Sequence, residues 1–427
     1  MFGICIITIF VLIIVNYIFR KNMFNEVTFI LLFWLVSVIT NKFGNIVYYE
    51  ISNKTYLVIM IGLSTFTAGN LWQTVYCSRH KKGDEKGQSI INWQVLYVFL
   101  VIHFLSSLNF LLSVFEFLSK EYSFLQIREI YQGYIEGVSF TNNYFEKITL
   151  HWIAQPLSIL LMIITLVLLI NNDYSHKKFI LLVIIDELLY FFYTQSRTSV
   201  FYIVVCLVVL YANNRRFISA LQRKRIRSVV AFIILGITIW TIVKFSDSKN
   251  WNGLKTYELY LGGGVSLLDY GIIKIDSKGF YSKGVNFFYG VYTIFYHIYY
   301  LLPVTKSDFN RNIVTIHAFK ENFVRIGPKV WFNAYYSFFY DFYIDGGVLA
   351  VAIECLLYGV ISSKNIIEMR LNKYDVEKQC KGLLMCIVVF MGVVRWQFVS
   401  PVFVFVYVYM FLIFHFKLKI RNVKVNV

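Results

Sequence analysis

The arginines of this chain fall where a guanidinium needs an anionic partner. Arg197 and Arg395 stand in very short polar turns, at 195–199 and 394–397, between apolar stretches. A guanidinium costs about 2.5–3.5 kcal/mol at the centre of a bilayer and less near its edge. Phosphate or pyrophosphate suits its planar fork best, whereas snorkelling or a pair with a carboxylate is the structural alternative. Three further arginines lie in longer polar segments that would cover these turns: Arg128, Arg311 and Arg325.

Acidic side chains also occur deep inside apolar stretches. Asp186 and Glu187 lie near the middle of one stretch, and Glu354 is similarly deep in another. A buried acid in a membrane marks a proton or ion path by default. We favour the structural alternative, a hydrogen bond between helices, with His103 as the candidate partner.

The segment that ends at Asp345 combines aromatic rings with acids. Sugar rings stack on aromatic faces through their C–H groups, so Tyr336 and Tyr340 are candidate glycan contacts. A membrane-interface belt is the alternative role for these tyrosines. Asp341 and Asp345 cap the apolar stretch that begins here, where we expect water and substrate to reach them.

Other chemical motifs are weak. The triplet Gly262-Gly263-Gly264 is a weak candidate for a phosphate-binding turn, because the Walker ending GK[ST] is missing. No CxxC motif and no metal-ligand spacing occurs, and the six cysteines lie in apolar stretches or at their ends. We therefore expect no disulfide framework, no metal and no cofactor.

The composition indicates which elements must position these residues. Of 427 residues 58% are hydrophobic and 15% charged, with a mean hydropathy of +0.61. A soluble protein of this size cannot keep so much apolar surface from water, so the excess belongs in a bilayer. We predict an all-α, polytopic integral membrane protein, one membrane domain over 1–427, with eleven helices. The predicted spans are roughly 2–19, 24–39, 55–77, 94–114, 148–170, 178–194, 198–212, 228–245, 335–361, 380–394 and 398–416.

Orientation follows from the placement of lysine and arginine, which favour cytoplasmic loops. Alternate counting from Arg20-Lys21 places the N-terminus outside and the basic C-terminus in the cytoplasm. This counting predicts two outer loops, 115–147 and 246–334, of which the first reads as amphipathic. Within the second loop, we expect the apolar segment 285–303 to form an interfacial or re-entrant helix. The net charge of +17 mostly reflects this bias, so we expect no nucleic-acid partner.

These features together resemble the O-antigen and capsular repeat-unit polymerases of the Wzy type. The similar stretches are the turn 195–199, the segment 260–264 with Leu268-Asp269, and the block from Asn333 through Asp341-Phe342 to Gly346-Gly347. Members often carry a glycine after the Asp-Phe pair, where this chain has Tyr343. The similarity of pattern covers about the C-terminal two thirds of the chain.

The resemblance implies a reaction at the outer face of the cytoplasmic (inner) membrane. A glycan on undecaprenyl pyrophosphate is transferred en bloc to the next lipid-linked repeat unit, with a flippase and a chain-length regulator as partners. The outward arginines would neutralise the leaving pyrophosphate without a metal. Asp341 and His317 are the first candidates for the base that accepts the proton of the attacking hydroxyl.

Other classes of protein stay open. The O-antigen ligases share the architecture and the arginines, and sequence separates them poorly from the polymerases. A repeat-unit flippase or other transporter should show internal repeats, which this chain lacks. Metal-dependent polytopic glycosyltransferases usually place two acids in the first outer loop, where this chain has only Glu50. A membrane scaffold would not need arginines in tight outer turns.

Overall fold

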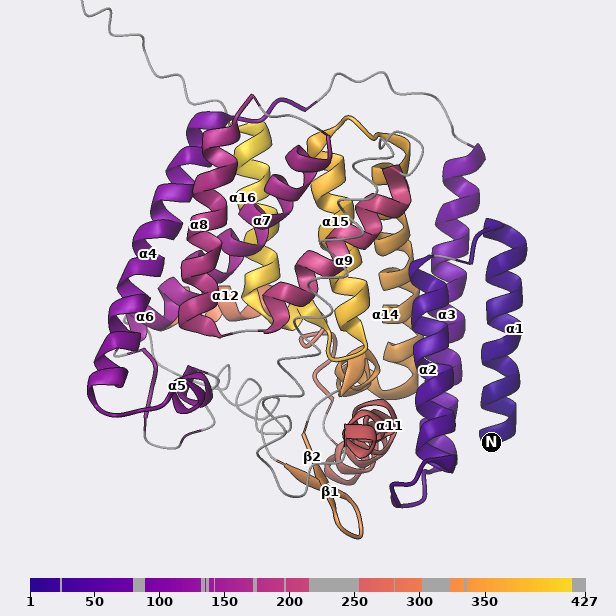
Figure 1. Ribbon diagram of the computed structural model, residues 1–427. Coiled ribbons are helices and arrows are strands. Elements are labelled where there is room, and N and C mark those ends of the chain that lie inside the picture. Colours follow the sequence, from indigo (N-terminus) through magenta and orange to yellow (C-terminus); the bar gives the residue numbers. More distant parts are fainter. Residues whose placement is uncertain are drawn as a thin grey trace, which may run out of the picture. The chain divides into compact units, whose positions relative to one another are not determined.

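The computed structural model describes residues 1–23, 25–79, 89–131, 135, 138–141, 143–171, 175–195, 197–214, 253–279, 281–301, 323–333 and 336–416. Over these residues the chain is mainly helical, and six helices are long and apolar enough to cross a membrane (Figure 1). They are Phe2–Arg20, Glu26–Phe43, Asn53–Cys77, Trp93–Ser119, Tyr144–Ile170 and Ser337–Leu371. The structure thus agrees with an all-α membrane protein, and the count of eleven spans stays a prediction.

The other predicted spans fall on shorter or more polar elements. The spans 198–212 and 398–416 coincide with two shorter apolar helices, α9 (Arg197–Asn214) and α16 (Pro401–His415). The spans 178–194 and 380–394 coincide with α8 (Lys177–Thr194) and α15 (Val376–Gly392), which carry more charge. The predicted span 228–245 lies outside the described residues.

The segment predicted as the main outer loop, 246–334, has secondary structure of its own. It contains the 26-residue helix α11 (Gly253–Lys278) and the helix α12 (Tyr289–Leu301), the latter within the segment predicted as an interfacial helix. An antiparallel hairpin of β1 (Val324–Gly327) and β2 (Val330–Phe332) follows. This hairpin is a small departure from the all-α prediction.

The glycine triplet is part of a helix, so its prediction as a phosphate-binding turn is wrong. Gly262 lies inside α11, where the missing side chain lets α2 (Glu26–Phe43) approach closely. The side-chain amide of Asn41 on α2 donates to the Gly262 carbonyl at 2.9 Å and to the Ser266 hydroxyl at 2.8 Å. The glycines therefore serve helix packing, in which small residues let backbones come together.

Residue contacts divide the chain into two compact units. The first comprises Met1–Asp84, Ile234–Glu368 and Leu384–Ser400, and the second comprises Glu85–Ile233, Met369–Leu383 and Pro401–Val427. The first unit contains α1 (Phe2–Arg20), α2, α3 (Asn53–Arg79), α11, α12, the hairpin, most of α14 (Ser337–Leu371) and the 3-10 turn η2 (Gln397–Val399). The second contains α4 (Trp93–Ser119), α5 (Phe124–Tyr131), α6 (Tyr144–Ile148), the π-helical turn η1 (Thr149–Ala154), α7 (Gln155–Ile170), α8, α9 and α16. Our prediction of one membrane domain stays a prediction.

In the first unit, α3 and α14 meet through glycines. A Cβ on Gly69 would collide with the Leu356 carbonyl, and one on Gly359 would collide with the Phe66 carbonyl. Both helices can therefore approach at backbone distance along this seam. Such close packing is the main attraction between helices in lipid, where apolar burial gives little preference.

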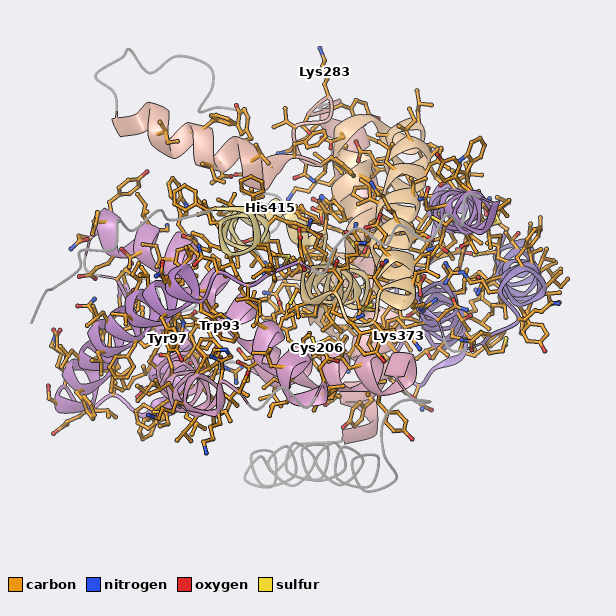
Figure 2. All side chains as sticks on the ribbon, turned by 90° about the horizontal axis from the view of Figure 1, so that it is seen from above. Trp93, Tyr97, Cys206, Lys283, Lys373 and His415 are labelled. Carbon is orange, nitrogen blue, oxygen red and sulfur yellow. The ribbon has the colours of Figure 1, made fainter. Side chains whose placement is uncertain are left out.

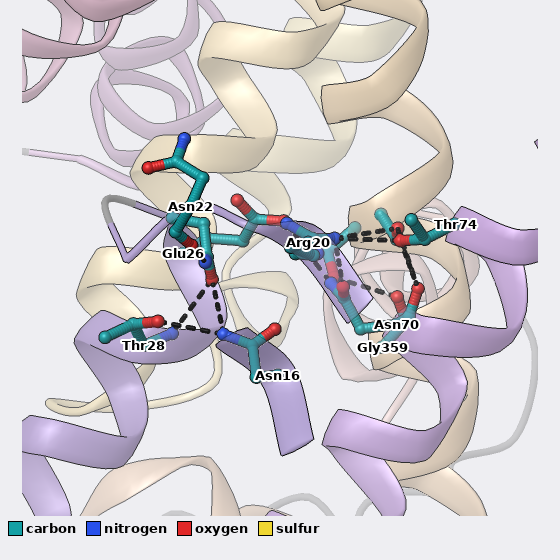
Figure 3. Close-up of polar contacts among 11 residues, drawn as sticks. Asn16, Arg20, Asn22, Glu26, Thr28, Asn70, Thr74 and Gly359 are labelled. Carbon is teal, nitrogen blue, oxygen red and sulfur yellow. Dashed lines mark hydrogen bonds and ion pairs between the residues drawn. The ribbon is translucent and has the colours of Figure 1, made fainter. Parts of the chain in front are cut away.

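A buried ion pair joins α1, α2 and α3 near the C-terminal end of α1. The Arg20 guanidinium donates to the Glu26 carboxylate at 2.6 Å, and the two side chains are 5% and 2% exposed (Figure 3). Its second nitrogen contacts the Asn70 side chain and the Thr74 hydroxyl, the latter at 3.1 Å. Asn70 and Thr74 belong to α3, so the pair ties three helices together. Charge this deep is tolerable because it is paired and hydrogen-bonded.

Helix α11 is fastened to the chain between α2 and α3 by acids on one face. Glu258 accepts from the Asn45 side chain at 2.5 Å, and Asp269 accepts from the Ser52 and Thr55 hydroxyls, each at 2.6 Å. Thr55 lies in the first turn of α3, so α11 holds the start of that helix. In Figure 1, α11 and the hairpin lie at the end of this unit where α1 begins.

In the second unit, the deep acids join helices, as expected from the sequence. His103 Nδ1 on α4 lies 2.5 Å from a carboxylate oxygen of Asp186 on α8, and both side chains are fully buried. The neighbouring Glu187 accepts from the Ser158 hydroxyl of α7 at 2.9 Å. The prediction of a His103–Asp186 contact is therefore confirmed. Rings reinforce the α4–α8 pair, since Trp93 and Tyr97 both pack edge-on against Phe179, and the two labelled α4 rings are seen in Figure 2.

A proline shapes the helix that crosses this unit. Pro156, near the start of α7, lacks the N–H that would bond the carbonyl of Trp152, four residues earlier. The segment just before it, η1, is a π-helical turn, and the Trp152 carbonyl instead accepts from the Tyr409 hydroxyl of α16 at 2.6 Å. The carbonyl four residues before the proline thus makes an interhelical contact.

The predicted outer segment 115–147 folds onto the second unit. Its helix α5 places Ile127 and Ile130 in a buried cluster with Phe110 and Phe117 of α4 and Tyr193 of α8. Arg128 and Glu129, on the same helix, are only partly buried. The helix is amphipathic, as the interleaved apolar and charged residues predict.

Candidate functional site

The site begins at a break in α14. Gly346 and Gly347 leave the helical conformation, and Gly347 has a φ of 66°, in the region that favours glycine. The break frees carbonyls that a continuous helix would use. The Ile344 carbonyl accepts the N–H of Ser282 at 2.9 Å, and the Asp345 carbonyl accepts the N–H of Lys283 at 2.9 Å. The loop after α11 therefore docks into the broken helix.

The carboxylate of Asp345 holds the same loop. One oxygen accepts from the Ser282 hydroxyl and from the Asn286 N–H at 2.9 Å, and the other accepts from the Phe287 N–H at 2.7 Å. Asp345 is buried. Both oxygens of this buried carboxylate have hydrogen-bond partners in the loop 282–287, so Asp345 stabilises the backbone of that loop.

The carboxylate of Asp341 plays a matching role for a second segment. Its two oxygens accept the backbone N–H of Trp396 at 2.8 Å and the side-chain amide of Asn286 at 3.2 Å. The indole N–H of Trp396 in turn donates to the Phe287 carbonyl at 2.9 Å. Asp341 thus joins α14, the loop 282–287 and the turn at 394–397. It is 0% exposed, so the expectation that water and substrate reach Asp341 is wrong in this structure, and the same holds for Asp345.

The turn that Asp341 holds presents Arg395 to solvent. Its backbone is fixed on both sides, because the Val394 carbonyl accepts from Ser337 N–H at 2.9 Å and the Arg395 carbonyl accepts from the Gln397 side chain at 3.0 Å. Arg395 itself is exposed. An exposed guanidinium on a fixed turn is the arrangement predicted for binding an anion.

Aromatic rings form the floor beneath this turn. Trp396 stacks on Phe287 with ring centroids 5.1 Å apart at 23°, and packs edge-on against Phe342 and Tyr358. Tyr358 is itself anchored, since its hydroxyl donates to the Val388 carbonyl at 3.1 Å. The rings exclude water from the Asp341 hydrogen bonds, which strengthens them.

The remaining predicted arginines have different surroundings. Arg325, on β1, is exposed, but its guanidinium donates to the Gly327 carbonyl at 3.3 Å and to the Pro328 carbonyl, so it stabilises its own hairpin turn. Arg128, on α5, has a buried Nε without a hydrogen-bond partner among the described residues. Arg197 begins α9, and its side chain lies outside what the structure describes. Arg311 lies outside the described residues, as does the predicted base His317.

The predicted glycan tyrosines are interior residues. Tyr336 is 5% exposed and Tyr340 is 0% exposed, with their rings 4.7 Å apart. The ring of Tyr340 lies against Gly271 of α11, where a Cβ would collide with it. In this structure both tyrosines contribute to the packing of α14, and a role in sugar binding stays a prediction.

Sequence reasoning missed a polar centre near the N-terminal end of α14. Asp276 of α11 accepts from Lys54 Nζ at 2.6 Å, from the Tyr343 hydroxyl at 2.7 Å and from the Tyr281 hydroxyl at 3.3 Å. Lys54 Nζ also lies 5.5 Å from the centroid of the Tyr343 ring. Partial burial opposes ionisation of Asp276, but the hydrogen bonds from Lys54, Tyr343 and Tyr281 outweigh it and hold the pKa below its ordinary 3.8.

One signal in the sequence points to this centre. Glu258, Asp269 and Asp276 are spaced by 11 and 7 residues. Three turns and two turns of a helix have nearly these lengths, so the three acids share one face. Recognising it requires knowing that 253–278 is a helix.

The comparisons with known proteins give no match among family models, curated proteins or solved structures.

Proposed function

We propose that this protein polymerises undecaprenyl-pyrophosphate-linked oligosaccharide repeat units, by en bloc glycosyl transfer at the outer face of the cytoplasmic membrane. The product is a surface polysaccharide of the O-antigen or capsular kind. The proposal rests on the resemblance of the motifs at 195–199, 260–269 and 333–347. The helical architecture, with six helices able to cross a membrane, is compatible with it.

The observation that carries the proposal is the Arg395 turn. The guanidinium is exposed, while its flanking backbone is held by Asp341 through the Trp396 N–H at 2.8 Å. The turn follows α15, which coincides with the predicted span 380–394, so we expect the turn to lie near the membrane edge, where a lipid-borne pyrophosphate would be. A cation carried on a backbone that is fixed before the substrate arrives needs less reorganisation on binding, and this is how electrostatic stabilisation becomes effective.

In the proposed reaction, the hydroxyl at the non-reducing end of the acceptor attacks the anomeric carbon of the donor glycan. A new glycosidic C–O bond forms while the C–O bond to pyrophosphate breaks, and undecaprenyl pyrophosphate leaves with the electron pair. Arg395 neutralises the developing charge, and the contributions of Arg197 and Arg311 stay predictions from the sequence. His317 stays the predicted base for the hydroxyl proton, and we now assign Asp341 a positioning role because its carboxylate is buried and occupied.

The test compares Arg395→Lys with Arg325→Lys in a strain from which the chromosomal gene is deleted. Lysine keeps the charge but not the planar fork, so Arg395→Lys should lower polymer formation about a hundred- to thousand-fold at normal membrane abundance. Arg325→Lys is the matched control, because that guanidinium bonds its own hairpin. Surface glycan should collapse to single repeat units in the deletion strain. Full-length polymer stranded on the carrier would instead indicate a ligase, and inner-leaflet accumulation a flippase.

Polymer of ordinary length and amount from Arg395→Lys would show that the turn is structural. The proposed function would then lose the observation on which it rests.

A further inference from the structure

Around Asp276 the structure brings a carboxylate, an ammonium and two phenols together in one exposed centre. The side chains of Lys54 and Asp276 are 45% and 31% exposed, and Tyr281 is 38% exposed. The Asp276 carboxylate comes from α11 and the Lys54 ammonium from α3, while the Tyr281 phenol comes from the loop after α11 and the Tyr343 phenol from α14. All these segments belong to the first unit. The centre is open to solvent, unlike the carboxylates of Asp341 and Asp345.

Hydrogen-bonding capacity is left over in this centre. An ionised carboxylate offers about four acceptor positions, and three donors occupy Asp276. Lys54 has three protons, of which one is on Asp276, and the Tyr281 oxygen retains lone pairs. Adjacent free donors and acceptors match a polyol, in which each hydroxyl both donates and accepts.

The aromatic component fits the same kind of ligand. The exposed ring of Tyr281 offers a face on which the C–H groups of a sugar can pack, with its hydroxyl pointing to Asp276 at 3.3 Å. A pyrophosphate is a poor fit, because the carboxylate at the centre would repel it. The depressed pKa of Asp276 keeps it ionised at neutral pH, so it remains an acceptor.

Position supports the assignment. Lys54 lies in the first turn of α3, a helix able to cross a membrane, so the centre is at the end of a predicted span rather than within it. The same end of the first unit holds α11 and the hairpin (Figure 1). A glycan carried on a membrane lipid must pass over such a surface.

We propose that Lys54, Asp276 and Tyr281 form a subsite that binds hydroxyl groups of the substrate glycan. This inference rests on the proposed function for the identity of the ligand. A purely structural role is the alternative, since Asp276 also helps to fasten α11 to α3, as Glu258 and Asp269 fasten it to neighbouring segments.

The experiment uses the purified full-length protein in lipid nanodiscs. The probe is the free repeat-unit oligosaccharide from the host's own polysaccharide, without lipid or pyrophosphate, and binding is followed by saturation-transfer NMR. Asp276→Asn and Tyr281→Ala should each weaken binding about tenfold, and Tyr281→Phe should weaken it less, because the ring remains. The thermal midpoint of Tyr281→Ala should match that of the wild type, since the side chain is exposed.

Glu258→Gln is the matched control for a fastening role, because Glu258 holds Asn45 from the same helix. It should leave oligosaccharide binding unchanged. Unaltered oligosaccharide binding by folded Asp276→Asn and Tyr281→Ala would overturn the subsite. Binding of inorganic pyrophosphate at these residues in place of the oligosaccharide would overturn it as well.

A second assay separates this subsite from the proposed function. The oligosaccharide on a neutral alkyl group can accept a glycan but cannot donate one, because it has no pyrophosphate to lose. Asp276→Asn should raise the KM for the glycan substrate with little change in kcat. Polymerisation by the wild type with an unaffected Asp276→Asn would refute only the subsite. Oligosaccharide binding by a wild type that forms no polymer would refute only the proposed function.

Discussion

Replacing Asp341 distinguishes a positioning carboxylate from a catalytic base. Asp341→Asn keeps an oxygen for the Trp396 N–H, now at 2.8 Å, but converts a charged acceptor into a neutral one. That difference costs about 1–1.5 kcal/mol. Asp341→Ala removes the acceptor altogether and leaves a buried N–H unpaired, at about 1–3 kcal/mol. The Asn286 amide loses its 3.2 Å contact as well, although it keeps the Asp341 carbonyl at 2.7 Å, so we expect about 2–4 kcal/mol in total.

The assay measures thermal stability in detergent, membrane abundance and polymerisation per folded molecule. A positioning residue predicts a graded loss of stability, Asn before Ala, with a matching rise in the KM for donor as the Arg395 turn loosens. Asn286→Ala is the control, since it removes the two side-chain contacts of Asn286 with Asp341, and Asn286 cannot act as a base. It should resemble Asp341→Asn in both stability and activity.

A catalytic base predicts another pattern. General-base catalysis is worth about 10²–10⁴ in rate, with the pH profile changed and stability intact. Our reasoning is refuted if Asp341→Asn is as stable as the wild type yet inactive while Asn286→Ala remains active.

Four other perturbations test separate parts of the structure. Glu26→Ala leaves the Arg20 charge buried without its carboxylate, so the free energy of unfolding should fall by about 3–5 kcal/mol and less folded protein should reach the membrane. Glu26→Gln should recover part of this loss, and normal abundance of Glu26→Ala would contradict the role of the ion pair. Asp186→Asn should retain activity in liposomes with or without an uncoupler, and collapse on uncoupling would favour transport. The pKa of Asp276 is lowered on folding, so the stability that its ionised form contributes is present above pH 3.8 and is lost as pH falls through the folded pKa. In calorimetry, the difference in melting temperature between wild type and Asp276→Asn should therefore be constant from pH 5 to 7 and shrink below pH 3.8. Lys283→Cys should react with an impermeant thiol reagent from outside, because Lys283 extends away from the ribbon (Figure 2), and labelling only after permeabilisation would invert the predicted topology.

Hydropathy predicted the long helices well because a span must satisfy its backbone internally and face lipid with apolar side chains. Residues 2–19 carry this signal almost without interruption. Helix α11 was missed because three glycines and several charges lower its hydropathy, and its stability comes from other segments. The evidence for it is the contacts of Asn41, Asn45 and Ser52, which lie over 200 residues away in sequence.

The role of a carboxylate is harder to predict than its importance. Asp341 is singled out by its place in the motif, but its partners come from the loop 282–287 and the turn 394–397. Nothing local in the sequence shows that these segments meet at the break beside Gly346. Arg325 is a different case. It is exposed, as the sequence predicts, but its guanidinium donates to the carbonyls of Gly327 and Pro328 in its own hairpin.

Buried and exposed charged groups therefore have different roles in the first unit. Asp269, Asp341 and Asp345 are buried, and each accepts hydrogen bonds that fix a connecting segment. The exposed groups, Arg395 and the Asp276 centre, are held in place by those segments and have capacity left for a ligand. Loss of activity on substituting a buried acid is therefore weak evidence for catalysis, because the loop it anchors carries the group that meets substrate. A claim of chemistry for any acid in this motif needs stability measured on the same variant, and the exposed residues are where substrate contacts should first be sought.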